Sequence, residues 1–210
     1  PDIVHTHGYR HPHSLFSNLL SKRKGIPIIL TSHGPFEKDE RRRFYLKLID
    51  KVYDSIISRF EIKNYKKIVA ISKWEIPYLK NLGGVEIELI PNSIGLEFFN
   101  QPIPESLNEI KNQVIYMGRV DSVKRLEWIQ SAAKRLENVN FKIVGPVQNL
   151  NEEFENKRLE NLMFINKKYT SDEFIEEIDK SDIFILPSIR ESFGIVLIEA
   201  MSRGKIVISS

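Results

Sequence analysis

Residues 113–145 read QVIYMGRVDSVKRLEWIQSAAKRLENVNFKIVG, and this stretch decides the fold. It opens with a nearly continuous apolar run at 113–118, passes through a helical pattern at 124–136, and closes with a second apolar run at 140–145. Runs that do not alternate with polar residues predict strands buried on both faces, as in parallel sheets covered by helices. The stretch therefore predicts a strand–helix–strand unit and an α/β fold.

The same alternation continues in both directions along the chain. Helical patterns are predicted at 42–60, 171–180 and 194–203, and the first is amphipathic. Its apolar positions share one stripe: Leu46, Ile49, Val52, Tyr53, Ile56, Ile57 and Phe60. Further strands are predicted at 2–7, 26–32, 67–72, 86–91, 162–166, 183–188 and 205–210. The whole chain therefore fits a doubly wound α/β architecture.

The alternation breaks once, at 92–112, where two prolines interrupt a segment with few periodic positions. We therefore expect two Rossmann-like βαβ domains facing across a cleft: 1–95, a linker at 96–112, and 113–210. The first domain shows only three or four strands, and the chain begins and ends on apolar runs. We expect a fragment truncated at both ends.

Composition excludes several classes of protein. The chain has 210 residues and no cysteine, which excludes disulfides, thiolate zinc sites and cysteine nucleophiles. The absence of cysteine fits a reducing setting, and we expect a cytoplasmic protein. No apolar run approaches the roughly 20 residues that a membrane span needs.

Basic clusters in the first half suggest one kind of partner. The net charge is +3, and the clusters lie at Lys22–Lys24 and Arg41–Arg43. Such clusters are commonly solvated surface, but they also suit peripheral contact with an anionic membrane face. No nucleic-acid-binding motif accompanies the charge, so we expect no nucleic-acid partner.

Residues 190–200, RESFGIVLIEA, place two glutamates around a glycine at a predicted strand–helix junction. Glu191 falls in the loop at the carboxyl end of the strand, which is the usual ligand crevice of a parallel sheet. Glu199 falls inside the helix that follows. An exposed Gly194 at the start of this helix would let an anion approach free backbone N–H groups. The structural alternative is a helix-terminal charge and a surface residue.

A second loop carries cations beyond the strand at 113–118. Gly118 leaves space at the strand end, and Arg119 and Lys124 lie five residues apart, where two cations can converge on one diphosphate. Neither GxxxxGK[ST] nor GxGxxG occurs, so a nucleotide would be held differently. Ordinary surface cations are again the alternative.

Four of the five histidines lie in VHTHGYRHPH, residues 4–13. Two His-x-His pairs resemble ligands of a metal-dependent hydrolase, which is an alternative function. That chemistry needs further ligands, and His33 is the one histidine outside the cluster. His33 and Gly34 follow a predicted strand in a tight loop. We expect His5 to be a packed strand residue.

The motifs together resemble the retaining glycosyltransferases of the GT-B fold, in family 4, which includes glycogen synthases and many mannosyl- and glucosyltransferases. The matching elements follow the family's order and cover nearly the whole chain: DIVHTH, TSHG, AISKWEIPYL, IPNSIGLEFF, GRVDSVKR and PSIRESFGIVLIEAMSRGKIVIS. The last, with its Glu-x7-Glu spacing, is the most specific. The chain departs from the family at Asn92-Ser93-Ile94-Gly95, where Asn-Gly-Val-Asp is usual, and at Lys205-Ile206, where Lys-Pro is frequent.

The resemblance implies a role for each candidate. Glu191 would contact hydroxyls of the transferred sugar and, with His33, carry catalysis. Glu199 would accept from the ribose hydroxyls, and His7, Gly8 and Gly34 would line the acceptor side of the cleft. Donor binding would rest on Arg119 and Lys124 at the diphosphate, with Gly118, Ser192, Phe193 and Gly194 around it.

The implied reaction moves a sugar from a nucleotide diphosphate sugar to an acceptor hydroxyl with retention at the anomeric carbon. It implies no cofactor and no metal, since cations and helix ends stabilise the departing diphosphate. The acceptor would be a saccharide, a lipid-linked molecule or a small molecule. A non-catalytic nucleotide-sugar-binding module or degenerate subunit is the other hypothesis. We expect these 210 residues alone to be inactive, or nearly so.

Overall fold

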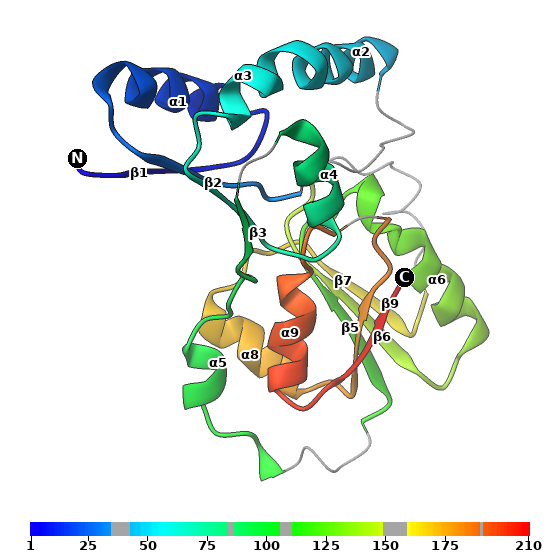
Figure 1. The fold of residues 1–210 in the computed structure, drawn as a ribbon. Helices are drawn as coiled ribbons and strands as arrows, with labels where there is room; N and C mark the ends of the chain where they lie inside the picture. The colour runs from blue at the N-terminus through cyan, green and yellow to red at the C-terminus, as the bar shows by residue number, and fades with distance from the viewer. Residues whose placement is uncertain (35–42, 84–85, 106–110, 149–158, 190) are drawn as a thin grey trace. The chain divides into compact units, whose positions relative to one another are not determined.

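The computed structural model describes residues 1–34, 43–83, 86–105, 111–148, 159–189 and 191–210. The chain divides into two compact units, Pro1–Asn92 and Ser93–Ser210, each built on its own parallel sheet (Figure 1). The nine predicted strands are all present. Their bounds are β1 Val4–His7, β2 Ile28–Thr31, β3 Lys67–Ala70, β4 Ile87–Leu89, β5 Gln113–Met117, β6 Asn140–Val144, β7 Leu162–Ile165, β8 Ile183–Leu186 and β9 Ile206–Ser209.

The first unit has the strand order β1-β2-β3-β4. Because strands that follow one another also pair, right-handed connections place the intervening helices on one face, where α3 contacts both α1 and α4. The core beneath them includes Ile28, Leu30, Ile68 and Leu79, all 1% exposed or less. The helical segments are α1 Pro12–Lys24, α2 Phe44–Val52, the π-helical η1 Tyr53–Ile57, α3 Ser58–Ile62 and α4 Glu75–Leu82.

Helix α1 packs on the sheet with its polar side. Pro12 begins the helix, and Gly25 ends it with a φ of +67° that favours glycine. The buried positions are Ser14, Asn18 and Ser21. Their polar groups are paired: Thr6 Oγ1 donates to Ser14 Oγ at 2.9 Å, and Asn18 Nδ2 donates to the Glu61 carbonyl at 3.1 Å. The large apolar side chains of α1 therefore point outward.

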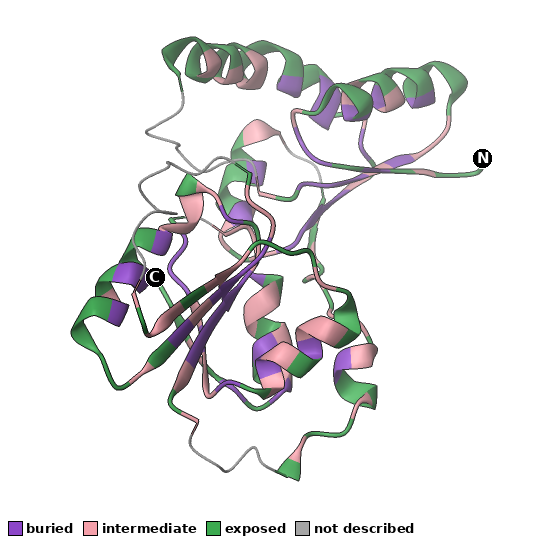
Figure 2. Ribbon diagram, turned by 180° about the vertical axis from the view of Figure 1, so that it is seen from behind, coloured by how far each residue is buried: buried purple, intermediate pink, exposed green. Residues whose placement is uncertain are grey.

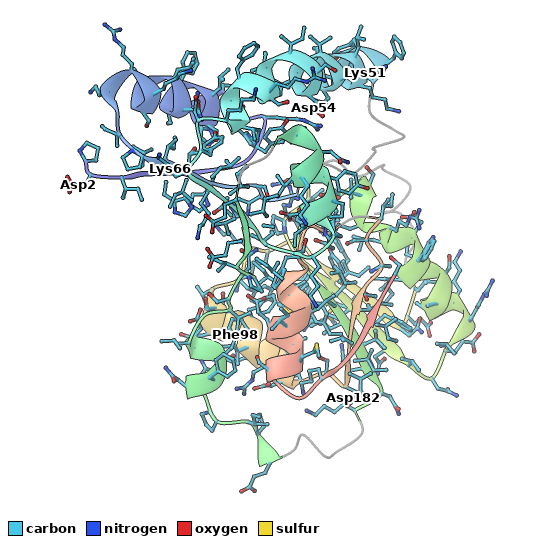
Figure 3. The ribbon with its side chains drawn as sticks, in the orientation of Figure 1. Asp2, Lys51, Asp54, Lys66, Phe98 and Asp182 are labelled. Atoms are coloured by element: carbon cyan, nitrogen blue, oxygen red, sulfur yellow. The ribbon has the colours of Figure 1, made fainter. Side chains whose placement is uncertain are left out.

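The helix predicted at 42–60 forms as α2, η1 and α3, and of its apolar stripe Tyr53 packs against the core while most other positions are exposed. The π turn shifts the phase of the helix and places Asp54, labelled in Figure 3, where Tyr9 Oη and Arg10 Nε each donate to it at 2.9 Å. The exposed fractions of stripe residues are 58% for Ile49, 47% for Val52, 57% for Ile56 and 72% for Phe60. Much of α1 to α3 is accordingly exposed (Figure 2).

The second unit has the strand order β7-β6-β5-β8-β9, so the direction of winding reverses between β5 and β8. Such a reversal is the topological switch point of a doubly wound sheet. Central strand β5 is buried along Val114 to Met117, as its unbroken apolar sequence predicts (Figure 2). The remaining elements of this unit are α5 Glu97–Asn100, the 3₁₀ turn η3 Ser122–Lys124, α6 Leu126–Arg135, α8 Ser171–Asp179 and α9 Ile195–Ser202.

The described part of the predicted linker is anchored to the second unit. Phe98 of α5, labelled in Figure 3, is 4% exposed. Arg203, 1% exposed, donates through Nη1 to the Phe98 and Gln101 carbonyls at 3.2 and 2.8 Å and through Nη2 to the Pro102 carbonyl at 2.8 Å. It also pairs with Asp179 through Nε at 3.0 Å and Nη2 at 2.6 Å. Residues 106–110 of the linker lie outside the described residues.

We predict that Arg203→Met destabilises the second unit by about 3–5 kcal/mol, because it leaves the Asp179 carboxylate buried without its cation. Urea unfolding followed by Trp128 fluorescence in a Trp74→Phe background measures this unit. The matched control is Arg135→Met, an exposed arginine at the end of α6, which should change stability by less than about 0.5 kcal/mol. Equal effects of the two substitutions would contradict the anchoring role.

Candidate active site

Two loops meet at the switch point of the second unit. One follows β5 at 118–125 and the other follows β8 at 187–194. The Ile189 N–H donates to the Val123 carbonyl at 2.9 Å, and Lys124 Nζ donates to Glu191 Oε1 at 2.5 Å. The structure thus joins Lys124 and Glu191, which lie 67 positions apart in the sequence.

The loop after β5 is held by its own polar groups. Tyr116 Oη donates to the Arg119 carbonyl at 2.5 Å, and Asp121 Oδ1 accepts from the Val123 N–H at 3.0 Å. Burial raises the pKa of Tyr116, and the charges of Asp121 and Glu191 add to this, so its hydroxyl stays protonated and donating. Gly118 lies against the end of β6, where a Cβ on Gly145 would meet the Gly118 carbonyl oxygen at 1.7 Å.

The cations of this loop have different surroundings. Lys124 is 13% exposed in its side chain and paired with Glu191, which is 30% exposed. Arg119 is exposed, and its Nη1 donates to Gln148 Oε1 at 3.4 Å. A phosphate bound here would compete with Glu191 for Lys124, and Arg119 could turn toward the same anion.

The start of α9 differs from the expectation. Gly194 is buried rather than exposed, with a φ of +71° that favours glycine. A Cβ at this position would lie 3.3 Å from Leu197 Cδ1 and 3.9 Å from the Glu191 Cβ, so these side chains cover it. Ser192 and Phe193, the other predicted residues of this loop, are half-buried just before the helix.

Glu199 lies one turn into α9 and is half-buried. Burial raises the pKa of its carboxyl, and the negative charge of Glu97 raises it further. The structure brings it near Glu97 of α5, a neighbour that the sequence did not suggest.

Sequence reasoning also missed Ser188, which follows β8. It is 4% exposed, and its Oγ has no hydrogen-bond partner among the described residues, while its carbonyl accepts from Ser210 Oγ at 2.7 Å. A buried hydroxyl without a partner beside a ligand loop is a candidate ligand contact. Only its position at the carboxyl end of the strand predicted at 183–188 could have marked it.

In the first unit, His7, Gly8, His33 and Gly34 come together at the carboxyl ends of β1 and β2. His7 Nδ1 lies 3.0 Å from His33 Nε2. His33 and Gly34 have φ of +56° and +62°, and Gly8 has a φ of +87°. Gly8 is buried, and His11 packs over it, since a Cβ would lie 2.4 Å from His11 Cδ2.

The other histidines do not form a metal centre in the described part of the chain. His5 is exposed and not packed as expected, because its side chain lies on the sheet face away from the helices, where Nε2 contacts Thr31 Oγ1 at 2.8 Å. His11 and His13 stack on each other at 5.3 Å between ring centroids. Within the described residues, no group of three or more His, Asp or Glu side chains is arranged to hold a metal.

A buried carboxylate beneath His33 was also missed. Glu75, the first residue of α4, is 0% exposed and accepts from Ser32 Oγ and from the Ile71 N–H at 3.3 Å. Burial raises the pKa of Glu75, and these hydrogen bonds oppose the rise. Glu75 therefore fixes the residue that precedes His33.

Comparison with solved structures defines the class of fold. The structure described as "Trehalose-6-phosphate from E. coli bound with UDP-2-fluoro glucose" matches with a TM-score of 0.72 at 14% identity, over 100% of this chain and 59% of that chain. The architecture is the GT-B fold, as the sequence predicted.

Sequence comparison identifies the family. A model of the glycosyl transferases group 1 matches residues 98–210, and a model of Glycosyltransferase Family 4 matches residues 1–98. The chain belongs to the family 4, group 1 glycosyltransferases.

Two curated relatives align with the whole chain. An uncharacterized glycosyltransferase of Methanocaldococcus jannaschii is 26% identical, and the chain covers 56% of it. The phosphatidyl-myo-inositol mannosyltransferase of Mycolicibacterium smegmatis is 25% identical, and the chain covers 53% of it. The chain thus spans about half the length of these relatives.

We predict that Glu199→Gln stabilises the protein at pH 7 and has little effect at pH 4. With the pKa of the folded carboxyl raised above its usual 4.5, the unfolded state loses its proton first, and the free energy of unfolding falls as the pH rises through this range. Urea unfolding at the two pH values measures the change in the free energy of unfolding that the substitution causes. The exposed Glu137→Gln is the control, and equal gains in both variants would exclude burial as the cause.

Proposed function

We propose that this protein is a retaining glycosyltransferase that moves a sugar from a nucleotide diphosphate sugar to an acceptor hydroxyl without a metal. The observation that carries the proposal is the meeting of Lys124 and Glu191 at the switch point of the second unit. Ligands of doubly wound sheets bind at this place. The E. coli structure with UDP-2-fluoro glucose, which has the same fold, supports this class of donor.

Each residue then has a task that suits its chemistry. Lys124 and Arg119 bind the diphosphate and stabilise the negative charge that develops on it as the sugar departs. Backbone N–H groups near Phe193 and Gly194 add helix-terminal donors. Because two cations and a helix end already oppose this charge, the proposal includes no metal.

Glu191 and His33 are the proposed catalytic residues. When a diphosphate replaces Glu191 as the partner of Lys124, the Glu191 carboxylate becomes available to accept hydrogen bonds from hydroxyls of the transferred sugar. Glu199 would accept from the ribose hydroxyls, and His33 would lie beside the donor sugar, with His7, Gly8 and Gly34 on the acceptor side. The cleft that would unite these two groups stays a prediction.

We predict that Lys124→Met weakens binding of the preferred nucleotide diphosphate sugar by about 10- to 100-fold, the loss expected for a hydrogen bond to a charged group. A thermal-shift screen of UDP, GDP and ADP sugars identifies the donor, and calorimetry with the chain then measures its Kd in the presence of EDTA.

The matched control is Lys142→Met. Lys142 belongs to the same unit, is 17% exposed in its side chain, and pairs with Glu177 away from the switch point. Unchanged affinity in Lys124→Met, or an equal loss in both variants, would contradict the donor site. A donor that binds only with added Mg²⁺ would contradict metal independence.

Glu191→Gln distinguishes an enzyme from a non-catalytic binding module. In an enzyme, this substitution should abolish sugar transfer, whereas a binding module transfers no sugar with or without it.

For the acceptor, we propose a lipid-linked molecule reached by peripheral contact with a membrane. Helix α1 exposes Phe16, Leu19 and Leu20, each at least 52% exposed, and α2 exposes Phe44 at 80%. In Figure 1 α1, α3 and α2 follow one another from left to right. Exposed apolar side chains on adjacent helices are the feature by which helices lie in a membrane interface.

Charge favours an anionic surface. Lys22, Arg23 and Lys24 occupy the last turn of α1, and Lys51 lies in the last turn of α2. Arg43 precedes α2, while Arg41 and Arg42 of the predicted cluster lie outside the described residues. Juxtaposed apolar and basic side chains suit anionic lipid headgroups. The M. smegmatis relative is named for a phosphatidyl acceptor, which supports this choice.

Within the described residues, no helix combines the length and apolar character that crossing a membrane requires. We propose a peripheral contact, at the cytoplasmic face.

We predict that the chain co-sediments with vesicles containing anionic lipid, and that Leu19→Glu/Phe44→Glu reduces the bound fraction by at least about 10-fold, because it places two charges in the apolar contact. The control is Met163→Glu, which adds a charge at a 59% exposed apolar position of the second unit. Vesicle binding that does not depend on salt concentration or on the fraction of anionic lipid would contradict the electrostatic contribution to the contact. Equal binding by all variants would contradict the surface itself.

A further inference from the structure

The ring nitrogens of His7 and His33 face each other at the end of the first sheet. The distance of 3.0 Å between His7 Nδ1 and His33 Nε2 is that of a hydrogen bond. In two neutral imidazoles, one of the facing nitrogens must carry a proton and the other must lack it. The tautomers of the two rings are therefore coupled: the proton on one ring decides which nitrogen of the other is protonated.

The backbone around the pair is fixed by the sheet. His7 lies opposite Thr31 in the register of β1 and β2, and the Gly8 N–H donates to the Thr31 carbonyl at 2.8 Å. Beyond the strand ends, the Tyr9 N–H donates to the Ser32 carbonyl at 3.1 Å, and the Ser32 N–H donates to the Val69 carbonyl at 3.1 Å. Both histidines thus project from a rigid frame, and their separation is set by it.

His33 adopts a backbone conformation that residues with a side chain rarely adopt. Its φ of +56° costs roughly 1–2 kcal/mol relative to ordinary conformations. Such conformations concentrate at functional sites. Both histidines of the pair are exposed, and a hydrogen bond exposed to water contributes little to stability. The hydrogen bond between the two histidines is therefore better explained by a role in orienting the His33 ring than by a contribution to the stability of the fold.

The facing ring nitrogens disfavour a second proton on the pair. A doubly protonated pair would place two N–H groups against each other, which breaks the hydrogen bond. Partial burial lowers the pKa of His33, and the neighbouring rings of His7, His5 and His11 lower it further. His13 also contacts the pair, since its Nε2 lies 2.8 Å from the His7 carbonyl oxygen.

We propose that His7 is a positioning residue for His33: its hydrogen bond holds the His33 imidazole in one orientation and couples its tautomer to that of His7. This inference rests on the proposed role of His33 in sugar transfer. His7 itself need not touch the sugar, and its contribution passes through the neighbouring ring.

The first test is direct and needs no activity. ¹⁵N NMR of the histidine ring nitrogens, recorded on the chain at pH 7.5, should show a single tautomer for both His7 and His33. His7→Phe keeps a ring of similar shape but removes both nitrogens, and it should return His33 to an average of the two tautomers. An averaged tautomer for His33 in the unsubstituted chain would overturn the proposal, whatever its activity.

The second test uses sugar transfer by the protein. His7→Phe should lower kcat by about 10- to 100-fold, the effect of a misplaced catalytic group, with KM for the donor changed by less than about threefold. His7→Asn should restore most of kcat, because an Asn side-chain amide can place a hydrogen-bonding atom near the position of Nδ1.

A double-mutant cycle shows whether His7 acts through His33. In a His33→Phe background, His7→Phe should have no further effect on kcat. His13→Phe is the control, since His13 contacts the His7 backbone and not its ring. Additive losses, failure of His7→Asn to rescue, or an equal loss in the control would overturn the proposal. A single tautomer by NMR with no loss of kcat in His33→Phe would instead contradict the proposed function.

Discussion

The reversal of strand order between β5 and β8 is the constraint on which the candidate donor site depends. At that point connections leave the sheet toward opposite faces, so the loops that follow the two strands diverge and leave room for a ligand between them. The other contacts of the site lie between these two loops. The hydrogen bond from Ile189 to Val123 holds the loops in register, and Lys124 and Glu191 occupy the space they leave.

In the first unit, helix α1 packs on the sheet with polar side chains. The helices of this unit must cover one face of a sheet, yet α1 does so with Ser14, Asn18 and Ser21. Burying hydroxyl and amide groups costs free energy unless each is paired, and here Thr6 and the Glu61 carbonyl supply partners. Small polar residues also allow close approach of helix and sheet. The large apolar residues Phe16, Leu19 and Leu20 are left on the exposed side of α1.

Much of the fold could be predicted because parallel strands are buried on both faces and leave long apolar runs, of which β5 is an example. The loops with Arg119, Lys124 and Glu191 could be predicted because each follows such a strand. Periodicity could not show which side of α1 packs, since it says which residues share a face but not which face is buried. The predicted stripe around Ile49 likewise names residues that share one face, and the structure shows that most of this face is exposed.

Contacts between distant positions were beyond prediction for a related reason. Arg203 and the Phe98 carbonyl lie 105 positions apart, and the sequence of neither segment indicates that the two are in contact. The exposure expected for Gly194 failed because Leu197, a turn along, folds back over it. The His7–His33 contact needed the register of β1 and β2, which a single sequence does not reveal.

The ion pair between Lys124 and Glu191 also shapes how the site responds to its surroundings. An anion that binds Lys124 exchanges one charged partner for another, so the number of ion pairs at that lysine stays the same. Dissolved salt weakens the internal pair and the ligand pair together. Ligand affinity at this lysine should therefore change less with ionic strength than affinity at an unpaired lysine.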